Sequence, residues 1–151
     1  MNIRFFSSLI LASSIIAAAE DQPMNDIEVK MQDIPVITST RGQVTQVQDP
    51  RIFYGLVNDE ITTLVCFSTN SCPTCKMQKR ALQELAIGHP EWRILLIDAE
   101  KSVDLSFRHE VTTVPHLVLY RQGQVRGVTG GRFGQSLVAW IRALSGELEN
   151  R

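Results

Sequence analysis

The feature that most constrains the fold is an apolar run that leads directly into a pair of closely spaced cysteines. The run TTLVCFST, residues 62–69, is rich in β-branched and aromatic side chains. Such a run predicts a strand buried on both faces, as in a sheet covered by helices. From residue 73 to 87 the spacing of apolar residues becomes helical. Cys72 and Cys75 are therefore expected where a buried strand passes into the N-terminus of a helix.

The first half of the chain predicts one more helix and some short strand. One or two strands are expected in residues 35–48, where Gly42 signals a turn. Asp49 followed by Pro50 predicts a helix N-terminus, and this helix would run to about Val57. In the helix after the cysteines, the expected apolar face consists of Met77, Ala81, Leu82, Leu85 and Ala86.

The second half predicts a strand, a short helix, a hairpin and a closing helix. WRILLIDAE, residues 92–100, has the pattern of a second buried strand. Residues 116–121 and 124–128 predict a hairpin with a turn at Gln122 and Gly123. The short helix is expected over residues 103–111, with Val103, Phe107 and Val111 on one face. The closing helix is expected to bury Leu137, Trp140, Ile141 and Leu144 and to end at Gly146.

This order of elements predicts an α/β fold class. The strand–helix–strand unit in the middle implies a parallel, right-handed crossover. The hairpin adds an antiparallel pair of strands. We therefore expect a central mixed sheet of four to five strands flanked by helices.

The N-terminus has the layout of a secretory signal peptide. Arg4 gives a sparse positive region, residues 5–16 are apolar apart from serines, and residues 17–19 are three alanines. The apolar run is shorter than the ~20 residues that a membrane helix needs. We expect a signal peptide at residues 1–19, an N-terminal lead-in at 20–33 and one domain at 34–151. The alternative is an uncleaved anchor, and in both cases the domain would face an extracytoplasmic space, the periplasm.

Length and charge exclude several classes of function. The 151 residues fit one domain, and the net charge of −1 becomes −2 when Arg4 is removed. The chain has no basic stripe that would bind nucleic acid and no basic amphipathic helix that would bind a membrane surface. We therefore do not expect nucleic acid or a membrane surface as a partner. We also expect a monomer.

The number of cysteines argues against a structural disulfide. The chain has three cysteines, which is an odd number. A disulfide between Cys72 and Cys75 would close a very short loop and would constrain the unfolded chain little. The pair is therefore better explained by chemistry than by stability.

The expected position of the pair assigns a different role to each cysteine. The first N–H groups of a helix lack intrahelical partners and carry partial positive charge, which lowers the pKa of a thiol placed there. Cys72, at the start of the helix, is expected to be the nucleophile, and Cys75, one turn deeper, the resolving thiol. Pro73 suits the first helical turn. Lys76 either adds favourable charge or points away from the sulfurs.

A zinc site is an alternative use of two cysteines with this spacing. Tetrahedral zinc needs two further ligands, and the candidates do not form a second close pair. These candidates are Cys66, His89, His109 and His116. We therefore predict no metal site and no other cofactor. Incidental placement of the two cysteines, without a redox role, is a further alternative.

The stretch from about Val36 to Gly146 resembles the thioredoxin superfamily. The resemblance rests on LVCFSTNSCPTCKMQ, ILLIDAE, TTVPHLVLYRQGQVRGVTGG and the final helix. It implies a thioredoxin-like fold and thiol–disulfide exchange with client proteins that carry cysteines or disulfides. It also implies a cis bond before Pro115 and pairing of the Val114 backbone with the bound client. A trans proline that begins a strand is the alternative.

The chain departs from the usual thioredoxin pattern around the cysteines. Pro73 and Thr74 stand between them in place of Gly-Pro, so these two residues are expected to tune the redox properties. In addition, Asn70-Ser71 replaces a tryptophan, Cys66 a buried acid, Ile94 its lysine neighbour and Arg80 a helix-kinking proline. Without the acid, proton transfer to and from Cys75 must rely on water or another group.

Two further residues near the motif each have two interpretations. Cys66 is either a small buried hydrophobe or a third exchanging thiol, and burial should keep it inert. His116 either sits near the sulfurs, where an imidazolium would stabilise the Cys72 thiolate, or points away. We expect solvated positions for His89, His109, Arg121, Arg126 and Arg132, and packing roles for Trp92 and Trp140.

Together these observations predict a periplasmic thiol–disulfide oxidoreductase that acts through Cys72 and Cys75. Val114 resembles the β-branched residue of reducing thioredoxins, whereas the Pro-Thr dipeptide and a charge on His116 would favour an oxidase. We favour a reductase or isomerase that receives electrons from a membrane or soluble redox partner. The alternative is an interaction module of a secretion or pilus assembly, in which the cysteines are incidental.

Overall fold

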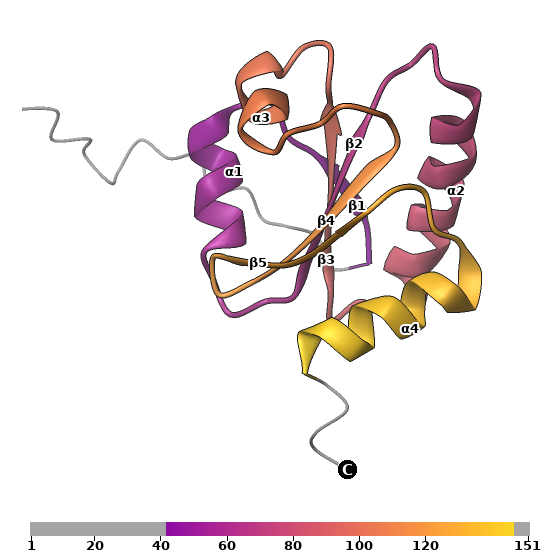
Figure 1. Cartoon of the computed structure of the whole chain (residues 1–151). Helices are drawn as coiled ribbons and strands as arrows, with labels where there is room; N and C mark the ends of the chain where they lie inside the picture. Colours follow the sequence, from indigo (N-terminus) through magenta and orange to yellow (C-terminus); the bar gives the residue numbers. More distant parts are fainter. Residues whose placement is uncertain (1–41, 147–151) are drawn as a thin grey trace, which may run out of the picture. The chain divides into compact units, whose positions relative to one another are not determined.

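The computed structural model of the chain describes residues 42–146 (Figure 1). The expected signal peptide, the lead-in and residues 35–41 lie outside the described residues. The described elements follow one another in the predicted order. They are β1 (Val44–Gln46), α1 (Pro50–Val57), β2 (Thr63–Ser68), α2 (Pro73–Gly88), β3 (Arg93–Asp98), α3 (Val103–Arg108), β4 (His116–Arg121), β5 (Gln124–Thr129) and α4 (Gly134–Ser145). None of the helices in this part of the chain is long and apolar enough to cross a bilayer.

The strands form one mixed sheet of five strands in the order β1-β3-β2-β4-β5. β1 and β2 both run parallel to β3. β4 runs antiparallel to β2 and to β5. β2 is the middle strand, and all of its residues are buried, as its unbroken apolar run predicts. The sheet confirms the predicted α/β, thioredoxin-like fold class.

Helices cover both faces of this sheet. In Figure 1, α1 and α3 lie on one side of the strands and α2 and α4 on the other. The core under α2 and α4 includes Leu64, Cys66, Leu82, Ile94, Leu117, Leu137 and Ile141. The core under α1 and α3 includes Phe53, Val65, Phe67, Leu95, Leu105 and Val118. Successive residues of β2 therefore enter different cores, because side chains alternate across a strand.

Local signals set the ends of several elements where they are predicted. The Asp49 carboxylate caps α1 and accepts a hydrogen bond from the Arg51 N–H at 2.8 Å. The turn of the β4–β5 hairpin has positive φ at Gln122 and Gly123, 54° and 72°. Glycine adopts this left-handed conformation without steric cost. Gly146 ends α4 in the same region, with φ of 74°.

Two of the predicted helix faces are wrong in detail. Met77 is predicted to face the core, but it is 60% exposed, and its neighbour Gln78 is fully buried. Val103 and Phe107 are exposed by 65% and 85%, and α3 buries Leu105 instead. A spacing of four residues shows which side chains share a helix face. Which face is buried depends on the surface that the helix packs against, and that surface comes from distant strands.

Candidate active site

Cys72 and Cys75 lie at the junction between β2 and α2. Cys72 is the N-cap of α2, with extended backbone (φ −84°, ψ 117°), and Pro73 is the first residue of the helix. The Cys72 Sγ accepts a hydrogen bond from the Cys75 N–H at 3.2 Å. The sulfur thereby satisfies one of the N–H groups that have no partner within a helix. The strand and helix patterns of the sequence predict this position.

The Cys72 thiol is partly exposed and has polar neighbours. Its Sγ lies 3.6 Å from Thr74 Oγ1 and 3.9 Å from the carbonyl oxygen of Val114. Hydrogen bonding from the Cys75 side chain lowers the pKa of Cys72, and the Thr74 side chain lowers it further. A lower pKa increases the fraction of thiolate, which is the nucleophilic form.

The Cys75 thiol has the opposite environment, because its side chain is fully buried. Burial raises the pKa of Cys75, and its hydrogen bond to the Cys72 side chain raises it further. All three cysteines of the chain, Cys66 included, are free thiols in this structure. The pair therefore consists of one accessible thiol with a lowered pKa and one buried thiol with a raised pKa.

A segment far away in the sequence faces the pair. The peptide bond between Val114 and Pro115 is cis, which is the isomer that the resemblance implies. Pro115 is buried, whereas Val114 keeps part of its surface accessible. The carbonyl oxygen of Val114 is the group that approaches the Cys72 sulfur. The backbone before Pro115 therefore forms one side of the site.

Cys66 lies in the middle of β2 and is fully buried. Burial is the main cause that raises the pKa of its thiol to about 12, and the neighbouring Cys75 contributes. Its Sγ contacts the carbonyl oxygen of Phe67 at 3.8 Å. A protonated thiol without access to solvent is a poor nucleophile. These observations support the interpretation of Cys66 as a packing residue.

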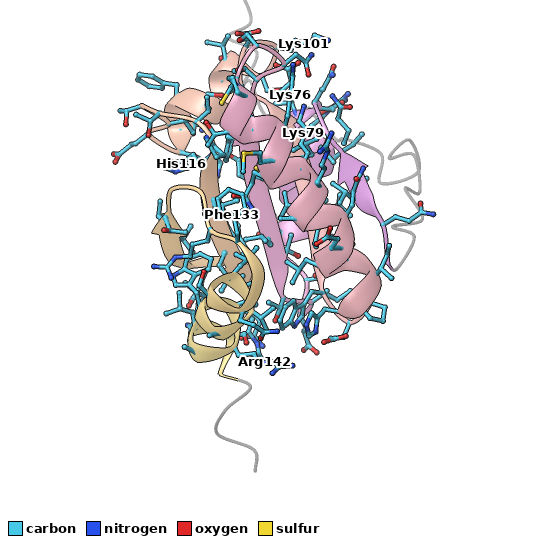
Figure 2. The ribbon with its side chains drawn as sticks, turned by 90° about the vertical axis from the view of Figure 1, so that its right-hand side faces the viewer. Lys76, Lys79, Lys101, His116, Phe133 and Arg142 are labelled. Carbon is cyan, nitrogen blue, oxygen red and sulfur yellow. The ribbon has the colours of Figure 1, made fainter. Side chains whose placement is uncertain are left out.

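His116, labelled in Figure 2, is the first residue of β4. It pairs with Phe67 of β2, and the two rings lie 6.1 Å apart between centroids. Phe67 belongs to the core under α1 and α3, whereas the cysteines begin α2. Burial lowers the pKa of His116, and the neighbouring His109 lowers it further. The lowered pKa disfavours the charged imidazolium, and the ring faces away from the helix that carries Cys72.

The other two histidines are packed rather than solvated, so their predicted positions are wrong. His109 Nδ1 lies 2.6 Å from the carbonyl oxygen of Leu105, and its Nε2 hydrogen-bonds the Tyr120 hydroxyl. His89 stacks on Trp92 with ring centroids 4.2 Å apart. A residue at a helix end is solvated only where no neighbouring segment covers it. Within residues 42–146, no three His, Cys, Asp or Glu side chains gather as a metal site.

Lys79, a residue that the sequence analysis does not single out, is a lysine whose charge acts on the buried thiol. Lys76 and Lys79 both project from the N-terminal half of α2 (Figure 2), but Lys76 is exposed. Lys79 follows Cys75 by four residues and therefore shares its helix face. Its Nζ donates a hydrogen bond to Asn70 Oδ1 at 3.1 Å. The charge of Lys79 lowers the pKa of Cys75, although burial outweighs it.

A buried glutamine that is absent from the predicted site joins α2 to a distant loop. Gln78 Nε2 donates a hydrogen bond to the carbonyl oxygen of Arg132 at 2.8 Å, and its Oε1 accepts one from the Arg132 N–H at 3.0 Å. Arg132 is predicted to be solvated, but its guanidinium lies over the Trp140 ring, 5.8 Å from the centroid. The sequence signal that could have pointed to Gln78 is its spacing of three residues from Cys75, which places both side chains on one face of the helix.

Comparisons with known proteins agree with this fold. The family model described as thioredoxin matches residues 43–143. Mitochondrial thioredoxin-3 of Saccharomyces cerevisiae is 28% identical over 106 residues, which cover 70% of this chain and 84% of that protein. Protein disulfide-isomerase A4 of Bos taurus is 30% identical over 108 residues, which cover 69% of this chain and 17% of that protein. A solved mutant thioredoxin from Halobacterium salinarum NRC-1 covers 72% of this chain and 96% of its own, with a TM-score of 0.66 and 22% identity.

Replacing Lys79 by methionine should raise the pKa of Cys75, because the positive charge that favours its thiolate is lost. The measurement is the ultraviolet absorbance of the thiolate against pH in a Cys72→Ser background. Lys76→Met is the matched control, since it removes the same charge from an exposed position of the same helix. The control should leave the titration unchanged, and equal shifts in both variants would contradict the prediction.

Replacing His116 by leucine should make the protein less sensitive to acid. The pKa of His116 in the folded protein is lowered. When the pH falls below about 6.5, the pKa in the unfolded chain, the unfolded state therefore binds more protons at this residue than the folded state does. The free energy of unfolding should therefore fall as the pH drops below that value in the original protein, and less steeply in His116→Leu. Urea denaturation between neutral and mildly acidic pH checks this. Parallel profiles for the two proteins would refute it.

Proposed function

The chain belongs to the thioredoxin family, and from this premise we propose an extracytoplasmic function for it. It exchanges disulfides with client proteins through the CPTC motif, residues 72–75. Cys72 is the nucleophile and Cys75 is the resolving thiol. The enzyme acts as a reductase or isomerase rather than as an oxidase, and it needs no bound cofactor.

The difference between the two thiols is the observation that carries this proposal. Cys72 is accessible and has a lowered pKa, which suits the group that attacks a client disulfide. Cys75 is buried and has a raised pKa, so it does not compete for the client. A redox reaction in two steps needs this order of reactivity.

Reduction of a client takes place by two successive displacements. The Cys72 thiolate attacks one sulfur of the client disulfide, the client S–S bond breaks, and the released client thiolate takes up a proton. Cys75 then gives up its proton and attacks the Cys72 sulfur of the mixed disulfide. This forms the Cys72–Cys75 disulfide and releases the second client thiolate. The client gains two electrons and the pair loses two, so a dithiol partner must return them.

The mixed disulfide itself prepares Cys75 for the second step. In the free enzyme, the hydrogen bond to Cys72 and its negative charge both raise the pKa of Cys75. A Cys72 sulfur that is bonded to the client carries no such charge. The positive charge of Lys79 remains. Cys75 therefore ionises more readily once the client is attached. This change in pKa takes over the role of the buried acid that this chain lacks.

The direction of electron flow is argued from the groups around Cys72. His116 pairs with Phe67, on the side of the sheet away from α2, and its pKa is lowered, which weakens one of the features that would favour an oxidase. Thr74 acts in the other direction, because it lowers the pKa of Cys72 and so stabilises the reduced form. Val114 before Pro115 resembles the reducing members of the family. On balance these groups favour a reductase or isomerase.

The location outside the cytoplasm rests on residues 1–19, which have the layout of a signal peptide. A form anchored through the same residues would carry out the same chemistry at the membrane surface. Extracytoplasmic compartments are oxidising. A reductase in such a compartment therefore depends on a membrane or soluble partner that supplies electrons.

Replacing Cys72 by serine should abolish catalysis of insulin reduction by dithiothreitol, because the nucleophile is lost. Cys75→Ser should instead accumulate a mixed disulfide with the client, since the resolving thiol is missing. Cys66→Ala is the control and should keep its activity, because Cys66 is buried and protonated. If Cys72→Ser kept full activity, the redox function would be wrong and an interaction module would be favoured.

The reduction potential of the Cys72–Cys75 pair tests the direction of the reaction. It is measured by equilibrating the mature protein with thiol–disulfide buffers of known ratio. A value near the thioredoxin end of the scale, about −270 mV, is expected for a reductase. A value near about −120 mV, which is typical of a strong disulfide donor, would show that the enzyme is an oxidase.

A further inference from the structure

The loop between β5 and α4 is fixed to α2 by the side chain of Gln78. Both hydrogen-bonding atoms of this buried amide are satisfied by the backbone of Arg132, at 2.8 and 3.0 Å. Two parallel hydrogen bonds to one residue fix the orientation of the loop as well as its position. An apolar side chain of similar size would fill the same space but would leave the Arg132 N–H and carbonyl without these partners.

The same loop packs tightly against Pro115. A Cβ atom added at Gly131 would lie 3.2 Å from Pro115 Cγ, 3.4 Å from Gln78 Oε1 and 3.7 Å from Phe133 Cε2. These distances leave little room for even one methyl group. Gly131 therefore allows the loop backbone to approach the proline closely. Gln78 holds the loop from one side, and Pro115 limits it from the other.

The two residues that hold this loop are themselves close in the chain to the groups of the active site. Gln78 is three residues beyond Cys75 on α2, and Val114, directly before Pro115, approaches the Cys72 sulfur to 3.9 Å. At the other end of the loop, Phe133 precedes α4 and is 39% exposed (Figure 2). Loop 130–133 thus adds an exposed backbone and one aromatic ring beside Pro115, the residue directly before β4.

We propose that Gln78 is a positioning residue for client recognition, which holds loop 130–133 beside Pro115 as a second wall of the client-binding site. The client is an extended peptide segment that carries the disulfide and lies along Val114, with an apolar side chain against Phe133. This inference rests on the proposed function. Gln78 does not touch the reacting atoms, so its loss should affect large clients and spare the chemistry of the cysteines.

The test compares a protein disulfide with a small one that needs no client-binding wall. Reduced Gln78→Met is mixed with insulin or with bis(2-hydroxyethyl) disulfide, and the second-order rate constants are measured by acid quenching and alkylation. The rate constant with insulin should fall about fivefold or more, which corresponds to the net contribution of about one hydrogen bond. The rate constant with the small disulfide and the reduction potential of the pair should stay unchanged.

Gln83→Met is the matched control, since Gln83 lies on the same helix but is exposed. It should leave both rate constants unchanged. Gly131→Ala is the second variant, because it displaces the loop by steric contact with Pro115 while Gln78 remains in place. It should show the same selective loss with insulin. This variant decides the question if Gln78→Met fails to fold.

Other results would overturn the inference in distinguishable ways. Equal loss with both disulfides, or no loss with insulin in the variants that fold, would show that Gln78 only contributes to stability. A shift in the reduction potential would show that Gln78 acts on the cysteines themselves and not on the client. If the original protein failed to reduce either disulfide, the proposed function itself would be wrong, and this inference would fall with it.

Discussion

The N–H groups in the first turn of α2 have no hydrogen-bond acceptor within the helix. The Cys72 sulfur accepts a hydrogen bond from one of them, the Cys75 N–H, at 3.2 Å. The site depends on this contact. It requires Cys72 to be the N-cap, with extended backbone, immediately after a strand that is buried on both faces. The apolar run of β2 places the chain there, and Pro73 begins the helix at the next residue. The same short stretch of sequence thus determines both the burial of β2 and the position of the reactive sulfur.

One turn of helix then separates two thiols with opposite properties. Cys72, at the N-terminus of the helix, keeps contact with solvent and receives hydrogen bonds that favour its thiolate. Cys75 points into the protein, where burial favours the protonated form. The same hydrogen bond between the two side chains lowers one pKa and raises the other. Cys66 extends this trend, because the middle of the sheet raises its pKa to about 12.

Most of the fold and the cysteine pair could be predicted from the sequence, because the signals are local. The apolar runs gave β2 and β3, and Gln122 and Gly123 gave the hairpin turn, since a strand or turn of this kind depends on neighbouring residues. Gln78 could not be predicted as part of the site, because its partner Arg132 is 54 residues away. The direction of His116 was also open, since it follows from pairing with β2.

The sheet explains why distant segments meet at the cysteines. β4 runs antiparallel to β2, so the start of β4, at His116, lies beside the end of β2, at Phe67. β5 runs antiparallel to β4, so its last residue, Thr129, returns to the same edge and pairs with Leu117. The segments that follow or precede these strand ends must therefore lie at the same end of the sheet. They contain the cysteines, the cis-proline bond and the loop that Gln78 holds. The strand directions bring these three segments together. A residue of loop 130–133 can therefore contact a client without touching either sulfur.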